Sequence, residues 1–198
     1  MKRPKPKKPR GEKLAFSPQQ IEMLAAFLQE KDDLRHRREY ALMRLAVDTM
    51  LRSVDLLALT HDMLMFDGRV VDDFEIQQQK TGERVKCILT EPARTAVEAY
   101  IARFSPAIQA EKDRRLFPFS GRWYHYLVVK WCRMIRLDPR RYGTHSFRRT
   151  KAKAIYGATG NIEACRQLLG HSSIAHTQKY LGVTKDEAAA FARKVVFK

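Results

Sequence analysis

Residues 143–181 constrain the fold of this chain more than any other stretch, because they carry the start and stop signals of three successive helices. Thr144 can cap a first helix, and Asn161 can cap a second. Gly170 stands where the second helix should end in a left-handed conformation. The pair Ser172-Ser173 then offers a cap to a third helix. The sequence therefore predicts three helices separated by two tight breaks.

Side chains suited to phosphate chemistry are spread over these helices: His145, Arg148, His171 and Tyr180. His145 and Arg148 are one helical turn apart and share a face. On one continuous helix, nine residues turn through about 900°, which would leave His171 and Tyr180 on opposite faces. The break at Gly170 instead allows both to face one pocket. Arginine offers phosphate a planar fork of donors, and tyrosine is a known covalent nucleophile.

The charge of the chain agrees with an anionic partner. Its 38 lysines and arginines exceed its 22 acids, giving a formal net charge of +16. Such a surplus attracts polyanions, and nucleic acid is the default partner. A ribosomal-type or merely soluble basic protein remains an alternative. The three cysteines are odd in number and far apart, so they are expected to be small core residues in a reducing cytosol.

The spacing of H-x-x-R, L-L-G-H and a tyrosine nine residues later resembles the tyrosine recombinase (phage integrase) family. The resemblance implies another arginine far upstream. Arg52, in D-T-M-L-R-S-V-D, fits that position, with Met50 where the family pattern has glycine and Asp55 where it has glutamate. Asp55 is expected to hold Arg52 through a charge-assisted pair, although its reach is shorter.

The resemblance also implies a lysine on a hairpin between the two arginines. Lys80, in Q-Q-K-T-G-E-R-V, stands at the tip of a predicted hairpin, and Arg84 and Lys86 are the nearest substitutes. Taken singly, each of the six residues has an ordinary structural explanation, such as a surface cation, a capping histidine or an aromatic anchor. Their joint appearance in order, on compatible elements, favours the functional interpretation.

The predicted fold is mainly α with a small three-stranded antiparallel sheet, similar to the tyrosine recombinase catalytic domain, the fold of DNA breaking-rejoining enzymes. The sheet is expected from two turns, Asp67-Gly68 and Lys80–Glu83, between apolar runs. Other helices are expected to begin after Ser17 and at Pro92, and to run over 34–51, 54–59, 123–135 and from 184 to the end. Residues 1–13 are predicted to be a basic flexible arm and residues 14–198 the catalytic domain, a short form without the family's separate N-terminal core-binding domain.

The resemblance implies a mechanism without metal or nucleotide cofactor. Tyr180 would attack a backbone phosphate and form a 3′-phosphotyrosine, while Arg52 and Arg148 clamp the phosphate oxygens. Lys80 would protonate the departing 5′ oxygen. His145 would act in proton transfer, and His171 would donate to the phosphate. A magnesium site at the acids 72, 73 and 75 is disfavoured, because on a hairpin they are expected to be edge charges.

The expected partner is double-stranded DNA, bound by a homo-oligomer (a dimer or tetramer) in the cytoplasm, associated with the nucleoid. The last helix would pack on a neighbouring protomer or on its own core, and an accessory DNA-bending protein or the basic arm would replace the missing domain. No membrane span is expected. The rival interpretations are a non-enzymatic DNA-binding protein with a helix-turn-helix at 161–181, and a type IB topoisomerase-like relaxing enzyme. The sequence does not specify the target site. It also does not specify whether the outcome, for example in a mobile genetic element, is integration, excision, inversion or dimer resolution.

Overall fold

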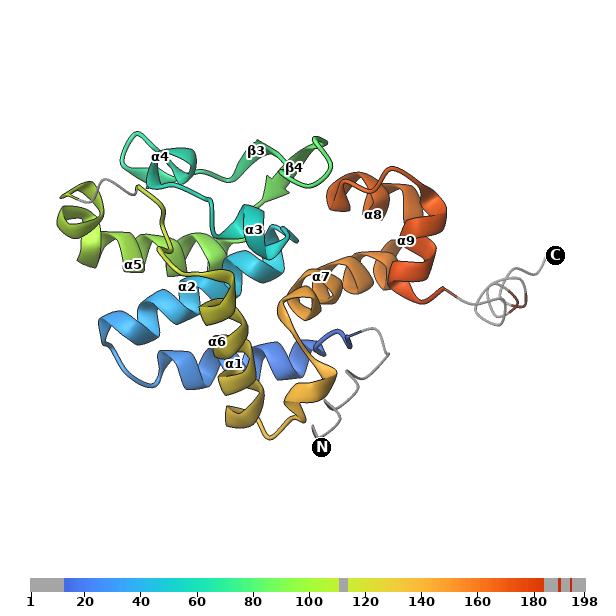
Figure 1. The fold of residues 1–198 in the computed structure, drawn as a ribbon, viewed down its shortest axis with the longest axis horizontal. Coiled ribbons are helices and arrows are strands. Elements are labelled where there is room, and N and C mark those ends of the chain that lie inside the picture. Colours follow the sequence, from blue (N-terminus) through green and yellow to red (C-terminus); the bar gives the residue numbers. More distant parts are fainter. Residues whose placement is uncertain (1–12, 111–113, 184–188, 190–192, 194–198) are drawn as a thin grey trace, which may run out of the picture.

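The computed structural model describes residues 13–110, 114–183, 189 and 193 of the 198-residue chain, without the side chains of 104–110. It confirms the predicted class, a mainly helical protein with small antiparallel sheets. The first two long helices lie beside α5 and α6, the hairpins lie along one edge, and the last three helices lie at one end, with α8 next to β4 (Figure 1). The predicted arm, apart from Lys13, and most of the predicted last helix lie outside the described residues, so the division at residue 13 stays a prediction.

The first half of the chain contains both hairpins. Its elements are α1 (Pro18–Gln29), α2 (Leu34–Asp48), α3 (Ser53–Leu56), α4 (His61–Leu64), β1 (Met65–Phe66), β2 (Arg69–Val70), β3 (Asp73–Gln77) and β4 (Arg84–Ile88). The second half is helical, with α5 (Glu91–Ala110), α6 (Gly121–Met134), the 3-10 turn η1 (Pro139–Arg141), α7 (Thr144–Thr159), α8 (Ile162–Leu169) and α9 (Ile174–Leu181). Helix α2 packs against α1, α5 and α7, and therefore lies at the centre.

The single three-stranded sheet was a wrong prediction, because the four strands form two separate antiparallel hairpins, β1–β2 and β3–β4. The strands of the first hairpin are only two residues long. The Val70 amide donates to the Glu98 side chain at 3.3 Å, and the amide of Val71, just after β2, donates to the Leu64 carbonyl at 2.9 Å. The second hairpin is regular, with five residue pairs from Asp73–Ile88 to Gln77–Arg84, and its turn contains Lys80 as predicted.

Several predicted helix ends are confirmed. Ser17, Asn161 and Ser173 each accept a backbone N–H as N-caps, and Gly170 ends α8 with φ of 59°. The cap of α7 differs from the prediction. Gly143, not Thr144, occupies the N-cap position, and its N–H donates to Ser146 Oγ at 3.0 Å.

Two other helices are shorter than predicted. Helix α2 ends at Asp48 and not at Leu51, because Met50 takes a left-handed φ of 51° that stops the helix. Helix α3 spans Ser53–Leu56 and does not reach residue 59. Arg52, not Ser53, occupies its N-cap position.

The buried side chains form two apolar clusters. The larger is built around α2, α5 and α6, and the smaller joins α7, α8 and α9 through Ala152, Cys165 and Leu181. Cys87, Cys132 and Cys165 are buried and unpaired, which confirms them as core residues. Among the described residues, no helix is long and apolar enough to cross a membrane. The predicted site residues lie where the smaller cluster meets α3 and the second hairpin.

Candidate active site

Arg148 lies on α7 and is only 2% exposed. Its guanidinium donates to the backbone carbonyls of Met50 and Leu169, and one nitrogen lies 3.4 Å from His171 Nε2. Burial, reinforced by the charge of Arg52, lowers the pKa of Arg148 to about 10, so it stays cationic at neutral pH. These hydrogen-bond partners are uncharged. A buried cation among neutral partners is costly, and an arriving anion would compensate it.

His171 lies in the turn after α8 and is 8% exposed. Its Nδ1 is 3.1 Å from Thr177 Oγ1, and the Thr177 hydroxyl donates in turn to the Ser173 carbonyl at 3.3 Å. This chain favours a neutral ring with its proton on Nδ1, which leaves Nε2 as an acceptor for Arg148. Burial and the nearby charge of Arg148 lower the pKa of His171 to about 4. Donation from Nε2 to a phosphate therefore requires a second proton, which a bound anion would favour.

Tyr180 projects from α9 into the same region, half-buried. Its ring meets the ring of His171 edge-on at 5.3 Å, and its hydroxyl donates to the His145 carbonyl at 3.4 Å. The guanidinium of Arg149 lies over the ring, 4.3 Å from the centroid. Burial raises the pKa of Tyr180, although the positive charges of Arg148 and Arg149 oppose that effect. The phenol is thus protonated at neutral pH, next to cations that would stabilise its anion.

Arg52 reaches the site from the start of α3 and is half-buried. The predicted Arg52–Asp55 pair was wrong. Arg52 donates to Oε1 of Gln78, while Asp55 Oδ1 accepts the Gln79 N–H at 2.9 Å. The short side chain of Asp55, buried on α3, faces the base of the hairpin turn and not the guanidinium. The acid thus anchors the hairpin, and a neutral amide holds the arginine.

His145 and Lys80 complete the predicted set. The His145 residue is exposed at the surface, but partial desolvation by its surroundings, together with the charges of Arg148 and Arg149, lowers the pKa of its imidazole. Lys80 is exposed in the turn between β3 and β4, near enough for its charge to contribute to the same lowering. The His145 imidazole is therefore neutral at physiological pH and able to accept a proton.

The structure brings Arg148, His171 and Tyr180 into direct contact, with the backbone of His145 against the tyrosine. Arg52 is close enough to lower the pKa of both Arg148 and His171. Lys80 is the most exposed cation of the six and lies on a turn that Asp55 anchors by accepting the N–H of Gln79.

Two residues at the site were missed by sequence reasoning. Arg149 follows Arg148 directly, and its buried position over Tyr180 is recognisable only once the two helices are placed together. Gln78 precedes Lys80 by two residues, and nothing in a run of three glutamines distinguishes the buried one. A helical or hairpin pattern identifies elements, but it does not identify contacts made across them.

Metal binding finds no obvious place in the described part of the chain, where no group of three or more His, Cys, Asp or Glu side chains is arranged around one point. Two of the hairpin acids pair with cations: Asp72 with Arg94, and Asp73 with Lys86 at 3.1 Å. The prediction that the reaction proceeds without a metal or a cofactor therefore stays a prediction.

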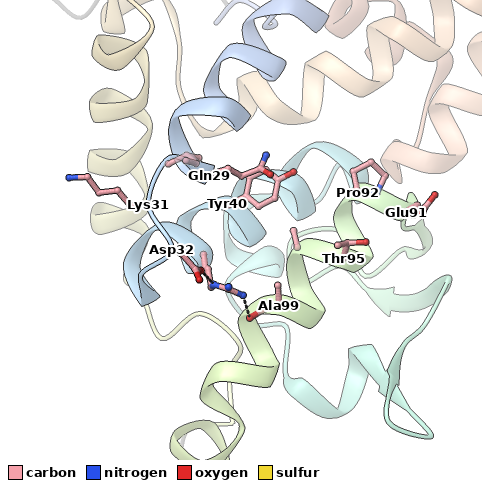
Figure 2. Close-up of a pocket in the computed structure, with 11 residues that line it drawn as sticks. Gln29, Lys31, Asp32, Tyr40, Glu91, Pro92, Thr95 and Ala99 are labelled. Carbon is pink, nitrogen blue, oxygen red and sulfur yellow. Dashed lines mark hydrogen bonds and ion pairs between the residues drawn. The ribbon is translucent and has the colours of Figure 1, made fainter.

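A pocket of about 480 Å³ lies elsewhere, between the end of α1, α2 and α5 (Figure 2). Arg37 is one of the lining residues, paired with Asp32 and donating to the Ala99 carbonyl at 3.2 Å. None of the six predicted site residues lines it. The candidate site is therefore the open cluster of cations around Tyr180 and not this pocket.

Comparison with known proteins identifies related chains. The phage integrase family model matches residues 15–187. Tyrosine recombinase XerC of Caldanaerobacter subterraneus subsp. tengcongensis is 28% identical over 153 residues, which cover 74% of this chain and 41% of XerC. The chain thus spans less than half the length of that relative.

Solved structures share the fold. The XerH site-specific recombinase, solved bound to its difH substrate, gives a TM-score of 0.72 at 17% identity, covering 91% of this chain and 55% of XerH. The catalytic domain of bacteriophage HP1 integrase gives 0.59 at 19% identity, covering 92% of this chain and 95% of that domain. At these identities the likeness establishes a common architecture.

Proposed function

We propose that this chain, which belongs to the phage integrase family, cleaves and rejoins DNA strands through a covalent bond between Tyr180 and a backbone phosphate. The observation that carries the proposal is the buried Arg148 cation, held by neutral groups and lying beside a phenol. A buried cation whose hydrogen-bond partners are uncharged, next to a nucleophile, is suited to an anionic substrate whose charge increases in the transition state.

In the proposed reaction, Tyr180 Oη forms a bond to phosphorus while the bond from phosphorus to the 5′ oxygen breaks. Arg148 and Arg52 stabilise the two non-bridging oxygens, each contribution being worth about 3–4 kcal/mol in a water-excluded site. The proton of the phenol passes to the neutral His145 imidazole or to water. The ammonium group of Lys80 gives its proton to the departing 5′ oxygen.

His171 would act in two ways. Without DNA, its Nε2 accepts from Arg148 and its Nδ1 donates to Thr177, so the ring holds the guanidinium in place. A phosphate beside Arg148 favours the doubly protonated ring, which then donates from Nε2 to an oxygen. Reversal of the first step by the hydroxyl of another strand is recombination, and the covalent bond conserves the phosphodiester energy without a cofactor.

We further propose double-stranded DNA as substrate, with two or four copies of the chain acting together and an accessory DNA-bending protein assisting. The surplus of basic residues and the family membership support DNA as the partner. The fold likeness to a recombinase solved on its substrate is consistent with this proposal.

Covalent capture tests the proposal. The wild-type chain is incubated with a library of randomised nicked duplexes, in which a nick just 3′ of each potential cleavage point lets a short fragment diffuse away and traps the adduct. We expect a denaturant-stable protein–DNA adduct from wild type and none from Tyr180→Phe, with equal DNA binding by the two. Binding without any adduct would favour the non-enzymatic DNA-binding interpretation, and plasmid relaxation without strand exchange would favour a topoisomerase.

A further inference from the structure

Gln78 is a polar side chain only 1% exposed, at the base of the turn that presents Lys80. Its Oε1 accepts from Arg52 and from the Thr81 hydroxyl, the latter at 3.1 Å. Its Nε2 donates to the Leu169 carbonyl at 3.2 Å. The side chain therefore uses both ends of its amide, one toward an arginine of the candidate site and the other toward the end of α8.

The Leu169 carbonyl is shared, because Arg148 donates to it as well. Gln78 thus joins the two arginines through one backbone oxygen, although they come from residues 96 positions apart (148 less 52). The packing at this junction is tight: a Cβ added at Gly170 would lie 2.7 Å from Val85 Cγ1 and 2.9 Å from the Gln78 amide. Movement of Gln78 would therefore disturb Arg52, the end of α8 and the hairpin together.

The chemistry of an amide suits this position. A carboxylate would hold Arg52 more strongly, but it would cancel the charge needed at a phosphate and would place two acceptors opposite each other at Leu169. The amide oxygen orients the guanidinium and leaves its charge available. An asparagine would be one carbon too short to make both contacts.

We infer that Gln78 is a positioning residue. It fixes the Arg52 guanidinium relative to Arg148 and to the turn that carries His171, and it holds the hairpin that carries Lys80 in position. The positioning itself is a property of the DNA-free protein. Its consequence for cleavage rests on the proposed function, so the experiment has one arm that needs no DNA and one that does.

The test compares Gln78→Met and Gln78→Glu with Gln77→Met. The control removes a hydrogen bond of the same hairpin, from Gln77 Nε2 to the Gly82 carbonyl at 3.1 Å, without touching Arg52. In the first arm, NMR of protein labelled with ¹⁵N-arginine measures guanidinium rotation, with the Arg52 signals assigned through Arg52→Lys. We expect rotation about tenfold faster in Gln78→Met, because a hydrogen bond to a charged group is lost, and rotation as in wild type in Gln77→Met and Gln78→Glu.

The second arm measures single-turnover adduct formation on a nicked duplex recovered by the wild-type enzyme from a randomised library. We expect Gln78→Met to be slower by about 10²-fold at saturating DNA, because the donor is misplaced, with DNA affinity in a Tyr180→Phe background nearly unchanged. Gln78→Glu should be slowed at least as much although its arginine is ordered. Gln77→Met should keep the wild-type rate.

Arg52 rotation in Gln78→Met equal to that in wild type would overturn the inference, as would equal slowing by Gln77→Met. Should Gln78→Met fail to fold, the similarly sized Gln78→Glu decides the question: a wild-type cleavage rate in that variant contradicts the argued need for a neutral amide. An absence of adduct with wild-type protein would reject the proposed function alone, because the NMR arm still decides whether Gln78 orders Arg52.

Discussion

The two arginines of the candidate site are held in different ways. Arg148 is buried on α7 and donates to the backbone carbonyls of Met50 and Leu169; with His171 and these carbonyls it forms what we term the Arg148 pocket. Arg52 is half-buried and is held by one side chain, Gln78; with that residue and Lys80 it forms what we term the hairpin side. The first depends on the helical core and the second on a two-stranded hairpin.

This difference shows two ways of holding a cation ready for a phosphate: by burial among packed helices, or through a side chain of a hairpin. The Arg148 pocket holds a buried cation with uncharged hydrogen-bond partners, which costs folding stability, and helix packing keeps the guanidinium in place. On the hairpin side, Lys80 lies on an exposed turn and Arg52, at the start of α3, is held by Gln78 of the same hairpin. Exposed turns open more easily than packed helices. We expect substitutions in the two regions to separate accordingly, with large catalytic effects in both but different effects on stability and order.

The largest effect is expected for Arg148→Met. Adduct formation should fall by about 10³-fold or more, because the site loses a pre-aimed donor. The free energy of unfolding should change by less than about 2 kcal/mol, because relief from burying a cation offsets the lost bonds to the Met50 and Leu169 carbonyls. Chemical denaturation and single-turnover cleavage measure the two quantities. Arg140→Met, at an exposed arginine paired with Asp138, is the control, and severe unfolding of Arg148→Met would contradict this account of the buried cation.

Lys80→Ala tests the hairpin side. Because Lys80 is exposed, we expect unchanged stability but adduct formation slower by about 10²-fold, the usual contribution of general acid catalysis. Arg84→Ala and Lys86→Ala are matched controls on the adjoining strand, and Lys86 is engaged with Asp73. A larger loss in either control than in Lys80→Ala would show that the lysine assignment is wrong.

Gly170 is the point where the two regions touch, so Gly170→Ala should disturb both. Its φ of 59° disfavours any side chain, and the added methyl would collide with Val85 and Gln78. We expect a loss of about 2–4 kcal/mol in the free energy of unfolding. Gly160→Ala, at φ of 65° with nothing within 4 Å, carries only the backbone cost and should lose about 1–2 kcal/mol. Thermal and chemical denaturation measure the two losses. If Gly170→Ala and Gly160→Ala lose the same free energy of unfolding, the junction at Gly170 is not tightly packed.

The smallest effect concerns pH and the Arg148 pocket. The pKa of His171 is about 4 in the folded protein and about 6.5 when unfolded, so between these values the unfolded chain binds more protons. Stability from this residue is present above pH about 6.5 and is lost as the pH falls toward about 4, by roughly 2–3 kcal/mol. The pH dependence of denaturation in wild type should therefore be steeper than in His171→Asn over this window. Parallel curves would contradict a neutral, buried His171.

Local signals explain why much of the fold was predictable. Asn161, Gly170 and Ser173 act within a few residues of themselves, through caps and a left-handed turn, so the sequence alone located the helix breaks that bring His171 to Tyr180. The turn carrying Lys80 was equally local. The family resemblance then supplied Arg52, which no local pattern would have distinguished from an ordinary helix-end cation.

Contacts across elements explain the rest. The predicted three-stranded sheet failed because the Val70 amide bonds to a side chain of α5, which strand patterns do not reveal. Asp55 was assigned to Arg52 because it stands where the family pattern has glutamate, but its carboxylate accepts a hydrogen bond from the Gln79 amide. Gln78 and Arg149 became visible only when the hairpin, α7 and α9 were placed together.

The most direct test of the account is to locate the residue that carries DNA in the trapped adduct. The adduct is digested with protease and nuclease, and the modified peptide is sequenced by mass spectrometry. The account predicts a single nucleotide-linked tyrosine, Tyr180, joined to a 3′ phosphate, with a free 5′ hydroxyl on the released strand. A nucleotide on any other residue, or a 5′ linkage, would contradict it.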